Sequence, residues 1–275
     1  MNLLKRVLSA AILIFIIVAT ILLGEIPTVI LTSIVCFLMM FDIVNALKCG
    51  GYRINKIVLL ICAALVFPAV YFKWIIGYFI LASLAFAVLT ICVIFSKEPD
   101  VKGLMASVFT LIYPLLPGAL LVLLTTRDLL NSEREGIVLC VGAVLCATMA
   151  DTFAYFFGIL FGKRKLCPQI SPKKTVMGSI ASFFGGTFGG FLMALFFKHN
   201  ASAVYIYDWL FIGFLCGGFA QIGDLTASLI KRHCNVKDYG TYIPGHGGIM
   251  DRMDSISTCL IAIFIYVQIF IPELL

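Results

Sequence analysis

The chain has 275 residues, of which 62% are hydrophobic and only 12% are charged, and its mean hydropathy is +1.10. Soluble domains are nearer half apolar and a quarter charged, and a core of this length cannot bury so much apolar surface. A water-soluble enzyme, a disordered chain and a small secreted domain are therefore excluded. The apolar residues fall in runs of about 20, the length that crosses the hydrocarbon of a bilayer as a helix. The composition predicts a polytopic membrane protein.

Apolar stretches bounded by charged residues predict an all-α fold with about nine membrane-spanning helices and one membrane domain over 1–275. The first follows Lys5 and Arg6, and we expect an uncleaved anchor because no persuasive cleavage site follows it. Only Lys73 separates the third from the fourth, beside Trp74 at an expected interface position. The predicted spans are 7–24, 27–46, 57–72, 74–96, 104–126, 137–160, 178–197, 207–230 and 255–272.

The distribution of basic residues sets the predicted orientation. With a cytoplasmic N-terminus and alternating spans, the outer side holds only Lys73, Arg127, Arg134 and Lys198, which leaves 16 of the 20 Lys and Arg inside. Cytoplasmic loops carry this excess in membrane proteins. We therefore predict an external C-terminus and two functional cytoplasmic loops, 161–177 and 231–254.

Glycines four residues apart are concentrated in the later spans, and such spacing lets helix backbones approach closely. We therefore divide the chain into an N-terminal helical scaffold, 1–135, and a catalytic portion, 136–275. The absence of a fixed-period repeat disfavours an inverted-repeat transporter without excluding it. The glycine pairs are Gly158/Gly162, Gly185/Gly189, Gly186/Gly190 and Gly213/Gly217.

The ten cysteines stand singly, mostly in apolar runs, without a CxxC pair. They match neither a zinc site nor a disulfide framework, and we predict that they are small apolar fillers. A soft-metal site through His233 and Cys234 is the alternative.

Three aspartates fall within predicted spans, where a carboxylate costs about 2.5–3.5 kcal/mol and indicates a functional site. The simpler explanation for Asp42 is that it reaches water at a cytoplasmic helix end. Asp151 lies within a few turns of the cytoplasmic end of its span. Asp224 is followed by Ser228 at i+4 and Lys231 at i+7, so one helix face carries a carboxylate, a hydroxyl and an ammonium. A structural polar seam between helices would explain Asp224 alone.

The loop 231–254 combines charges of both signs with a glycine-rich segment, Gly245–Gly248. A backbone with few side chains exposes its N–H groups to an anion, and neighbouring cations suit phosphates. Several carboxylates suit Mg²⁺, which shares one or two of them with water and substrate phosphates. A basic patch that only faces lipid needs no interleaved aspartates. The charged residues are Lys231, Arg232, Lys237, Asp238, Asp251, Arg252 and Asp254.

The loop 161–177 carries a second basic group, for which contact with anionic lipid headgroups is the alternative explanation. The chain has no P-loop, no GxSxG nucleophile motif and no HExxH motif. Phosphoryl-type chemistry over magnesium remains. The polar residues of this loop include Lys163, Arg164, Lys165, Ser171, Lys173, Lys174 and Thr175.

These residues resemble the signature of the phosphatidate cytidylyltransferases, also called CDP-diacylglycerol synthases. An upstream pattern over 151–175 is also similar, although Val176 and Met177 stand where the family often has Trp-Glu, which puts a ligand role at 177 in doubt. The resemblance is strong over 151–254, whereas the N-terminal half matches only as a helical membrane segment. The fixed places of the signature are filled by Ser228, Lys231, Arg232, Lys237, Asp238, Gly240, Pro244, His246, Gly247, Gly248, Asp251, Arg252 and Asp254.

The resemblance implies transfer of CMP from CTP to phosphatidic acid, with Mg²⁺ as the cofactor, at an active site that faces the cytoplasm. It also implies a homodimer among membrane lipids and no nucleic-acid partner. A bacterial inner membrane is expected, since no transit peptide or long soluble extension is present.

The same resemblance supports roles for individual residues. We expect Asp224 and Asp251 to bind Mg²⁺, and Asp151 and Asp254 to form outer contacts or to hold a second cation. Catalytic roles are expected for Asp224, Lys237, Asp251 and Arg252. Substrate contacts are expected for Ser171, Lys173, Lys174, Ser228, Lys231, Arg232, Asp238, His246, Gly247, Gly248 and Asp254.

Three other functions stay open. The first is a CTP-dependent transferase that acts on another membrane lipid. The second is an ion-coupled transporter with Asp151 and Asp224 along its path, and the third is a structural scaffold.

Overall fold

The computed structural model describes residues 15–125, 133–197, 204–240 and 247–271. They form two compact units, each with its own core. Unit 1 comprises Met1–Thr126 with Ile230–Met253, and unit 2 comprises Arg127–Leu229 with Asp254–Leu275. The C-terminal charged segment thus groups with the N-terminal helices.

Unit 1 is built on helix α2, which packs against both α3 and α5. The core side of α2 buries Cys36, Met39, Met40 and Ile43 completely. The predicted span 7–24 begins outside the described residues, and its part 15–23 is helical. The helices of this unit are α2 (Glu25–Cys49), α3 (Lys56–Ile94), α4 (Val101–Ile112) and α5 (Leu115–Leu124).

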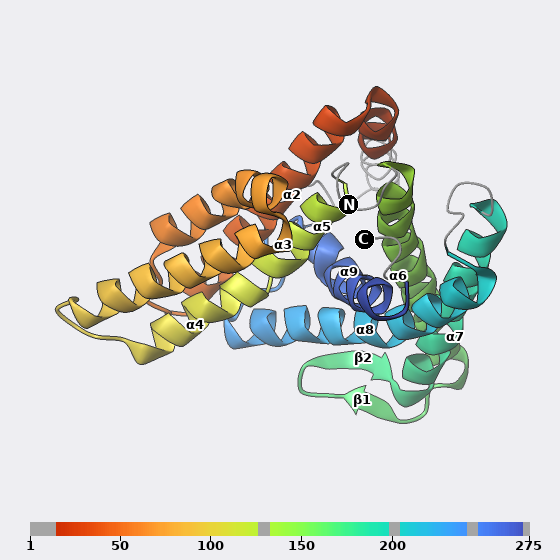
Figure 1. Cartoon of the computed structure of the whole chain (residues 1–275). Coiled ribbons are helices and arrows are strands. Elements are labelled where there is room, and N and C mark those ends of the chain that lie inside the picture. The colour runs from red at the N-terminus through yellow and green to blue at the C-terminus, as the bar shows by residue number, and fades with distance from the viewer. Residues whose placement is uncertain (1–14, 126–132, 198–203, 241–246, 272–275) are drawn as a thin grey trace. The chain divides into compact units, whose positions relative to one another are not determined.

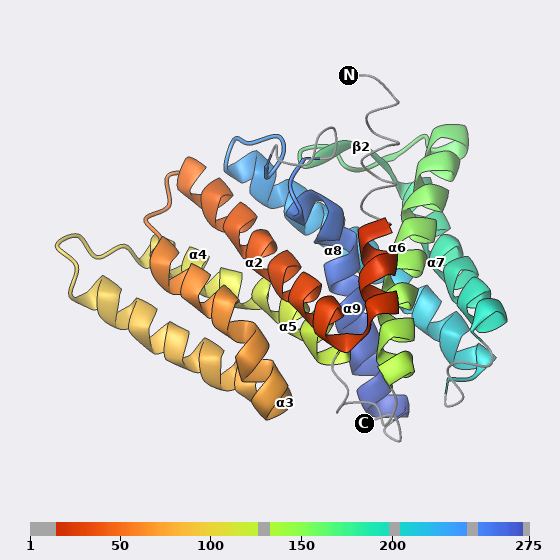
Figure 2. The same cartoon turned by 90° about the horizontal axis from the view of Figure 1, so that it is seen from above.

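Helix α3 covers two predicted spans, 57–72 and 74–96, without an intervening loop. Figures 1 and 2 show it folding back, so that its two arms lie side by side. The apolar sequence divides in the same way, into Lys56–Phe72 and Ile75–Ile94. Only 22% of the most apolar stretch of Ile75–Ile94 is buried, so this arm requires an apolar solvent.

The predicted span 104–126 matches the apolar stretch Val101–Leu124, which is long enough to cross a membrane but is not one continuous helix. The chain breaks between α4 and α5 at Tyr113, which is extended with φ −129° and ψ 102°. Proline disfavours the helical region for the residue before it, and Pro114 follows here. The break divides the span into two short helices that pack on each other.

Unit 2 holds the later helices and one β-hairpin. Helices α6 and α7 lie along each other, and both contact the hairpin (Figure 1). Of α8 and α9, the segments up to Leu229 and from Asp254 belong to this unit. The elements are α6 (Glu133–Phe161), β1 (Lys165–Cys167), β2 (Ser171–Thr175), α7 (Val176–Phe196), α8 (Ile206–His233) and α9 (Met250–Phe270).

The glycines of α7 allow its backbone to contact the backbones of two neighbouring helices directly. A Cβ placed on Gly189 would lie 2.8 Å from the Cα of Cys146 on α6. A Cβ on Gly186 would lie 2.7 Å from the backbone N of Gly217 on α8. The predicted close packing at these glycines is confirmed.

The predicted loop 161–177 contains structure that the all-α prediction missed. Strands β1 and β2 pair antiparallel, with Lys165 opposite Thr175 and Cys167 opposite Ser171. Three- and five-residue strands are too short for a periodic pattern to be recognised in the sequence.

The boundaries predicted for the second loop, 231–254, were also wrong. Helix α8 continues to His233 and α9 already begins at Met250. The predicted spans end at charged residues. However, cations stabilise the last turn of a helix and carboxylates stabilise the first turn, so such residues can belong to the helix. Lys231 and Arg232 lie in the last turn of α8, and Asp251 lies in the first turn of α9.

The described residues contain seven helical segments that are long and apolar enough to cross a membrane. Large hydrophobic side chains remain exposed along them, including Leu84 and Phe184. Exposed apolar surface on this scale is stable in lipid and not in water, so the chain is a polytopic membrane protein.

The ten cysteines all lie in described ranges, and all are free. Six are buried, which fits the predicted filler role, whereas Cys49 and Cys92 are exposed and Cys140 and Cys167 are half-buried.

Replacing Gly186 by Ala should destabilise unit 2 by about 1–3 kcal/mol, because the new methyl group meets backbone that cannot move aside. Thermal unfolding in detergent measures the effect. Gly218→Ala on α8 is the matched control, since its Cβ meets only the ring end of Phe183, at 3.0 Å. Equal melting temperatures for the two variants would contradict the backbone contact.

Candidate functional site

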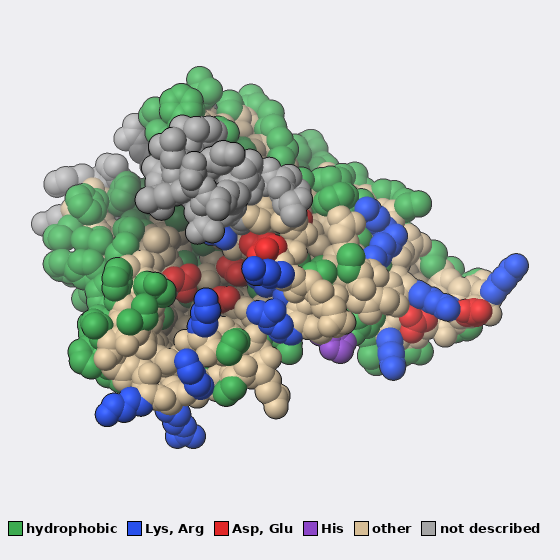
Figure 3. Space-filling view, turned by 180° about the vertical axis from the view of Figure 1, so that it is seen from behind, with side chains coloured by type: hydrophobic (Ala, Val, Ile, Leu, Met, Phe, Trp, Pro, Cys, Tyr) green, Lys and Arg blue, Asp and Glu red, His purple; other side chains and the backbone are tan. Residues whose placement is uncertain are grey.

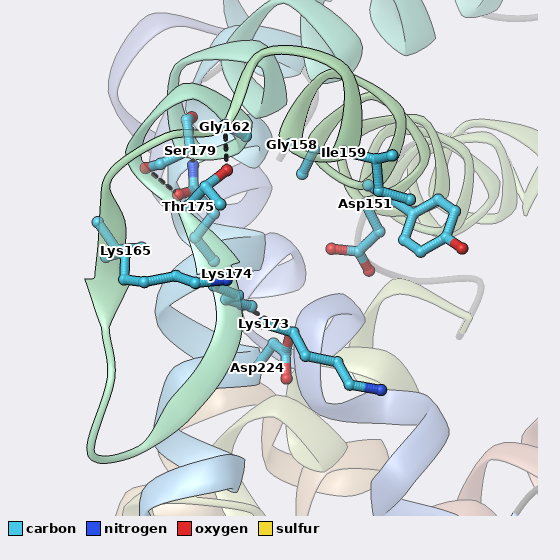
Figure 4. Close-up of a pocket in the computed structure, with 15 residues that line it drawn as sticks. Asp151, Gly158, Ile159, Gly162, Lys165, Lys173, Lys174, Thr175, Ser179 and Asp224 are labelled. Carbon is cyan, nitrogen blue, oxygen red and sulfur yellow. Dashed lines mark hydrogen bonds and ion pairs between the residues drawn. The ribbon is translucent and has the colours of Figure 1, made fainter.

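A cavity of about 640 Å³ in unit 2 is bordered by α6, the hairpin, α7 and α8. Two of the predicted carboxylates of this unit, Asp151 and Asp224, line it. Figure 4 shows these two carboxylates with Lys173 and Lys174 of β2 beside them. The remaining lining residues are Ala154, Tyr155, Gly158, Ile159, Gly162, Lys165, Leu166, Thr175, Gly178, Ser179 and Gln221.

The charges in this cavity interact directly. Lys174 Nζ lies 2.6 Å from Asp224 Oδ2, and the two side chains are only 24% and 30% exposed. Ser228 Oγ donates to Asp224 Oδ1 at 3.4 Å. Asp151 interacts electrostatically with both Asp224 and Lys174, and the Ser255 side chain lies close to it. Asp224 thus pairs directly with the Lys174 ammonium, and Asp151 lies within the influence of the same charge.

The end of the hairpin positions Lys174 through its neighbour, Thr175. Thr175 is buried and is the N-cap of α7, where its hydroxyl accepts the Gly178 N–H at 3.1 Å. Gly162 leaves room for it, because a Cβ there would lie 2.6 Å from Thr175 Cγ2. The cap fixes the angle at which β2 enters α7, and so holds Lys174 over the cavity.

Gln221 and Ser179 were not predicted as site residues from the sequence. Gln221 Nε2 donates to the backbone O of Ser179 and of Gly217, at 3.0 Å each. The Ser179 hydroxyl donates to Gln221 Oε1. This pair ties α7 to α8 one turn before Asp224. The position of Gln221, three residues from Asp224 on the same helix face, was the available signal.

The basic residues of the hairpin have different positions. Lys165 and Lys173 are exposed and line the cavity, whereas Ser171 is half-buried and lies outside its lining. In the space-filling view, acidic side chains lie inside a hollow, and Lys and Arg side chains lie beside it (Figure 3). An anionic ligand entering this cavity would meet lysine side chains first.

In unit 1, Asp251 is the centre of a second polar cluster. Its Oδ1 accepts Lys231 Nζ at 2.8 Å, and its Oδ2 accepts the N–H groups of Tyr239 at 2.8 Å and Gly248 at 3.0 Å. The Asp251 side chain is only 5% exposed. Lys231 also lies over the Tyr239 ring, 5.2 Å from its centroid. The carboxylate is compensated by a cation and two amides, as a buried charge requires.

The glycine-rich segment meets this cluster. Gly247 has φ +79°, a conformation that favours glycine, and a Cβ there would lie 2.7 Å from Asp251 Oδ2. The Gly248 amide, expected to face an anion, points at the Asp251 carboxylate of the chain itself. Pro244 and His246 lie outside the described residues.

The other predicted residues near the end of α8 and the start of α9 differ in their exposure. The side chains of Arg232, Lys237, Asp238 and Arg252 are exposed in unit 1. Asp254 belongs to unit 2, is half-buried, and its Oδ1 accepts the Ser255 N–H at 2.7 Å.

The expectation that Asp42 reaches water was wrong. Asp42 has no exposed surface, and its Oδ2 accepts the Met250 N–H at 2.9 Å. The proximity of a span end was a misleading signal, because the start of α9 covers this part of α2 within unit 1.

The oxygen donors of the cavity suit a hard dication. Asp151 and Asp224 supply two carboxylates, and Ser228 and Ser255 supply hydroxyls beside them. Mg²⁺ takes few protein ligands and completes its shell with water and substrate phosphates. Across the described ranges, no three or more His, Cys, Asp or Glu side chains cluster as a complete metal cage. The donors fit a cation that binds together with a phosphate substrate.

A soft-metal site at His233 and Cys234 finds no support. His233 Nε2 lies 2.6 Å from the hydroxyl of Tyr52. Cys234 is buried against Gly50, where a Cβ would lie 2.8 Å from its sulfur.

A second cavity, of about 460 Å³, lies in unit 1 among α2, α3 and α4. Its Arg53 pairs with Glu98, whose hydrogen bond raises the pKa of the guanidinium above its ordinary value. Its Lys56 donates to Asn45 at 3.0 Å and lies 4.5 Å from the centroid of Phe41. These two cations already have protein partners, so this cavity is the weaker candidate.

The sequence was compared with known proteins. A family model described as "Cytidylyltransferase family" matches residues 4–270. A "Phosphatidate cytidylyltransferase" of Staphylococcus saprophyticus is 41% identical over 127 residues, 46% of this chain and 48% of that protein. Proteins of the same name are 43% identical over 130 residues in Bacillus subtilis (46% of each chain) and 35% identical over 181 residues in Haemophilus influenzae (64% of this chain, 60% of the other). The match with the first of these thus spans about half the length of that relative.

Thr175→Val should lower the stability of unit 2 by about 0.5–2 kcal/mol, because the Gly178 N–H loses its acceptor. Thr175→Ser, which keeps the oxygen, should stay close to the wild type. Melting temperatures in detergent distinguish the two. A serine variant as unstable as the valine variant would show that packing, and not the cap, is what Thr175 supplies.

Proposed function

Because the chain belongs to the cytidylyltransferase family, we propose that it transfers CMP from CTP to phosphatidic acid, giving CDP-diacylglycerol and pyrophosphate. The cavity in unit 2 carries the proposal. It places two carboxylates of apolar helices beside three lysines of the hairpin, where a water-soluble nucleotide and a lipid phosphate can meet. The names of the relatives supply the choice of acceptor.

In this reaction an oxygen of the lipid phosphate attacks the α-phosphorus of CTP. A new P–O bond forms, the bond to the bridging oxygen of the β-phosphate breaks, and pyrophosphate leaves with the electron pair. The nucleophile already carries a negative charge at neutral pH, so no strong general base is needed. The protein has to bring two anions together and stabilise the leaving group.

The residues of unit 2 suit the nucleotide. Lys165 and Lys173 are exposed and suit the first contact with the triphosphate, and we assign Ser171 to the same function. Lys174 is already paired with Asp224, which holds its charge in the cavity. Ser228 orients Asp224 through its hydroxyl.

In unit 2, Asp224 and Asp151 are proposed ligands of Mg²⁺, with Asp254 as a further contact or part of a second cation site. In unit 1, Asp251 is assigned as a Mg²⁺ ligand as well. When bound, the metal would neutralise charge on the nucleotide phosphates and orient them. In unit 1 we assign Lys237 and Arg252 to the pyrophosphate or the lipid phosphate. Further substrate contacts are assigned to Lys231, Arg232, Asp238, His246, Gly247 and Gly248.

We further propose nine spans, with each arm of α3 crossing separately, a cytoplasmic N-terminus and a site facing the cytoplasm of a bacterial inner membrane. The excess of Lys and Arg on one side supports this orientation, and the bacterial relatives support the membrane. We also propose a homodimer, which cross-linking in native membranes would test.

The direct test is an assay of the purified full chain with labelled CTP, Mg²⁺ and a panel of lipid acceptors in detergent. We expect labelled CDP-diacylglycerol from phosphatidic acid and little product from a polyprenyl phosphate or an archaeal-type ether lipid. Preference for another lipid would keep the chemistry and change the substrate. Ion transport into sealed vesicles without CTP consumption would overturn the proposal.

Asp224→Asn and Asp251→Asn should each lower Mg²⁺-dependent pyrophosphate release by about 100-fold or more, because each removes a charge that acts in a partly desolvated site. Pyrophosphate release from CTP and phosphatidate measures this effect. Asp208→Asn is the matched control on α8, since Asp208 lies outside the cavity, where its two oxygens accept Tyr205 N–H and Tyr266 O–H, and the amide of asparagine keeps one of these two acceptors while removing the charge. Turnover like that of the wild type in either test variant would remove that residue from the metal site.

A further inference from the structure

Asp42 joins two segments of unit 1 that lie far apart in the sequence. Its carboxylate is completely buried on α2 and accepts the N–H of Met250, the first residue of α9, at 2.9 Å. The first N–H groups of a helix lack partners within the helix, and a negative charge there is favourable. Asp42 therefore caps α9 from another helix.

The same carboxylate also lies against the glycine-rich segment. A Cβ on Gly248 would clash with Asp42 Oδ2 and would lie 2.9 Å from the backbone N of Gly240. The backbone at Gly248 is therefore confined between Asp42 and the segment around Gly240. A side chain at 248 would displace one of them.

Asp42 and Asp251 accept hydrogen bonds from different backbone amides at and before the start of α9. Asp42 accepts from Met250, and Asp251 accepts from Gly248 and Tyr239. If the Met250 amide lost its acceptor, the first turn of α9 would be free to fray, and Asp251 lies in that turn. The position of Asp251 thus depends on an acceptor that is 208 residues from Met250 in the sequence.

We propose that Asp42 is a positioning residue: it fixes the start of α9 and thereby the orientation of Asp251 and of the Gly247-Gly248 backbone, without touching substrate. The inference rests on the proposed function of Asp251 and extends it to a residue outside the signature segment. What Asp42 supplies is an acceptor oxygen at a fixed place.

Three variants of the full chain test this role. Asp42→Asn keeps an oxygen at the same place, and Asp42→Leu has a similar size without an acceptor. The control is Thr32→Val on the same helix, because Thr32 is buried, bonds to Val29 O and lies 3.5 Å from the Thr125 hydroxyl, away from α9.

The first measurement needs no substrate or metal. Amide hydrogen exchange of peptides covering 247–253 in detergent should be about tenfold faster in Asp42→Leu than in the wild type. Asp42→Asn and Thr32→Val should exchange like the wild type. Unchanged exchange in Asp42→Leu would overturn the proposal, and so would an asparagine variant as fast as the leucine variant.

The second measurement is kinetic. In Asp42→Leu, kcat/KM for CTP should fall by about 100-fold, since displacement of a catalytic group by about 1 Å has such an effect. The Mg²⁺ concentration for half-maximal rate should also rise, which a general loss of folded protein does not produce. A leucine variant with only fewer active molecules, and with unchanged KM and Mg²⁺ dependence, would reduce Asp42 to a structural role.

The two measurements distinguish failures of different kinds. If the wild type transfers no CMP to phosphatidic acid, the proposed function fails, while the exchange data still decide whether Asp42 holds α9. If the wild type is active and the exchange rates do not differ, only the role of Asp42 fails.

Discussion

A carboxylate within an apolar helix is stable only beside a cation, an amide N–H or water, and this requirement organises both units. Asp224 meets Lys174, Asp251 meets Lys231 and two amides, and Asp42 meets the first amide of α9. In each case the partner belongs to another segment, which the rest of the chain has to hold in place. Lys174 lies on the hairpin, and the amide of Gly248 belongs to the glycine-rich segment.

Rigid helix packing keeps these partner groups at fixed positions. In unit 2, glycines bring the backbones of α6, α7 and α8 so close that little sliding is possible without a clash. Gln221 and Thr175 then add directional bonds at the cavity itself. The charged side chains are consequently held by hydrogen bonds and by backbone contact, whereas the large apolar side chains on the outer surface face lipid. This division suits an enzyme whose substrates arrive from water and from the bilayer.

Hydropathy and charge in the sequence predict most of the helices, because the bilayer permits only long apolar helices with polar ends. The same reasoning ended α8 too early and began α9 too late at their charged turns, and it did not show the break at Tyr113. The hairpin was missed because its strands are too short for a pattern. The pairing of Lys174 with Asp224 and the burial of Asp42 depend on contacts between distant segments, which no local signal records. The residues of the signature are recognisable, but their partners are not.

In the proposed site, Asp151 and Asp224, beside Lys174, hold a hard divalent cation together with the nucleotide. Binding of Mn²⁺ as a paramagnetic substitute, followed by electron paramagnetic resonance in the presence of CTP, tests it most directly. We expect a bound Mn²⁺ signal in the wild type that Mg²⁺ displaces, and affinity at least about tenfold weaker in Asp151→Asn/Asp224→Asn, given the two lost ligand charges. Equal Mn²⁺ affinity in the two proteins would contradict it.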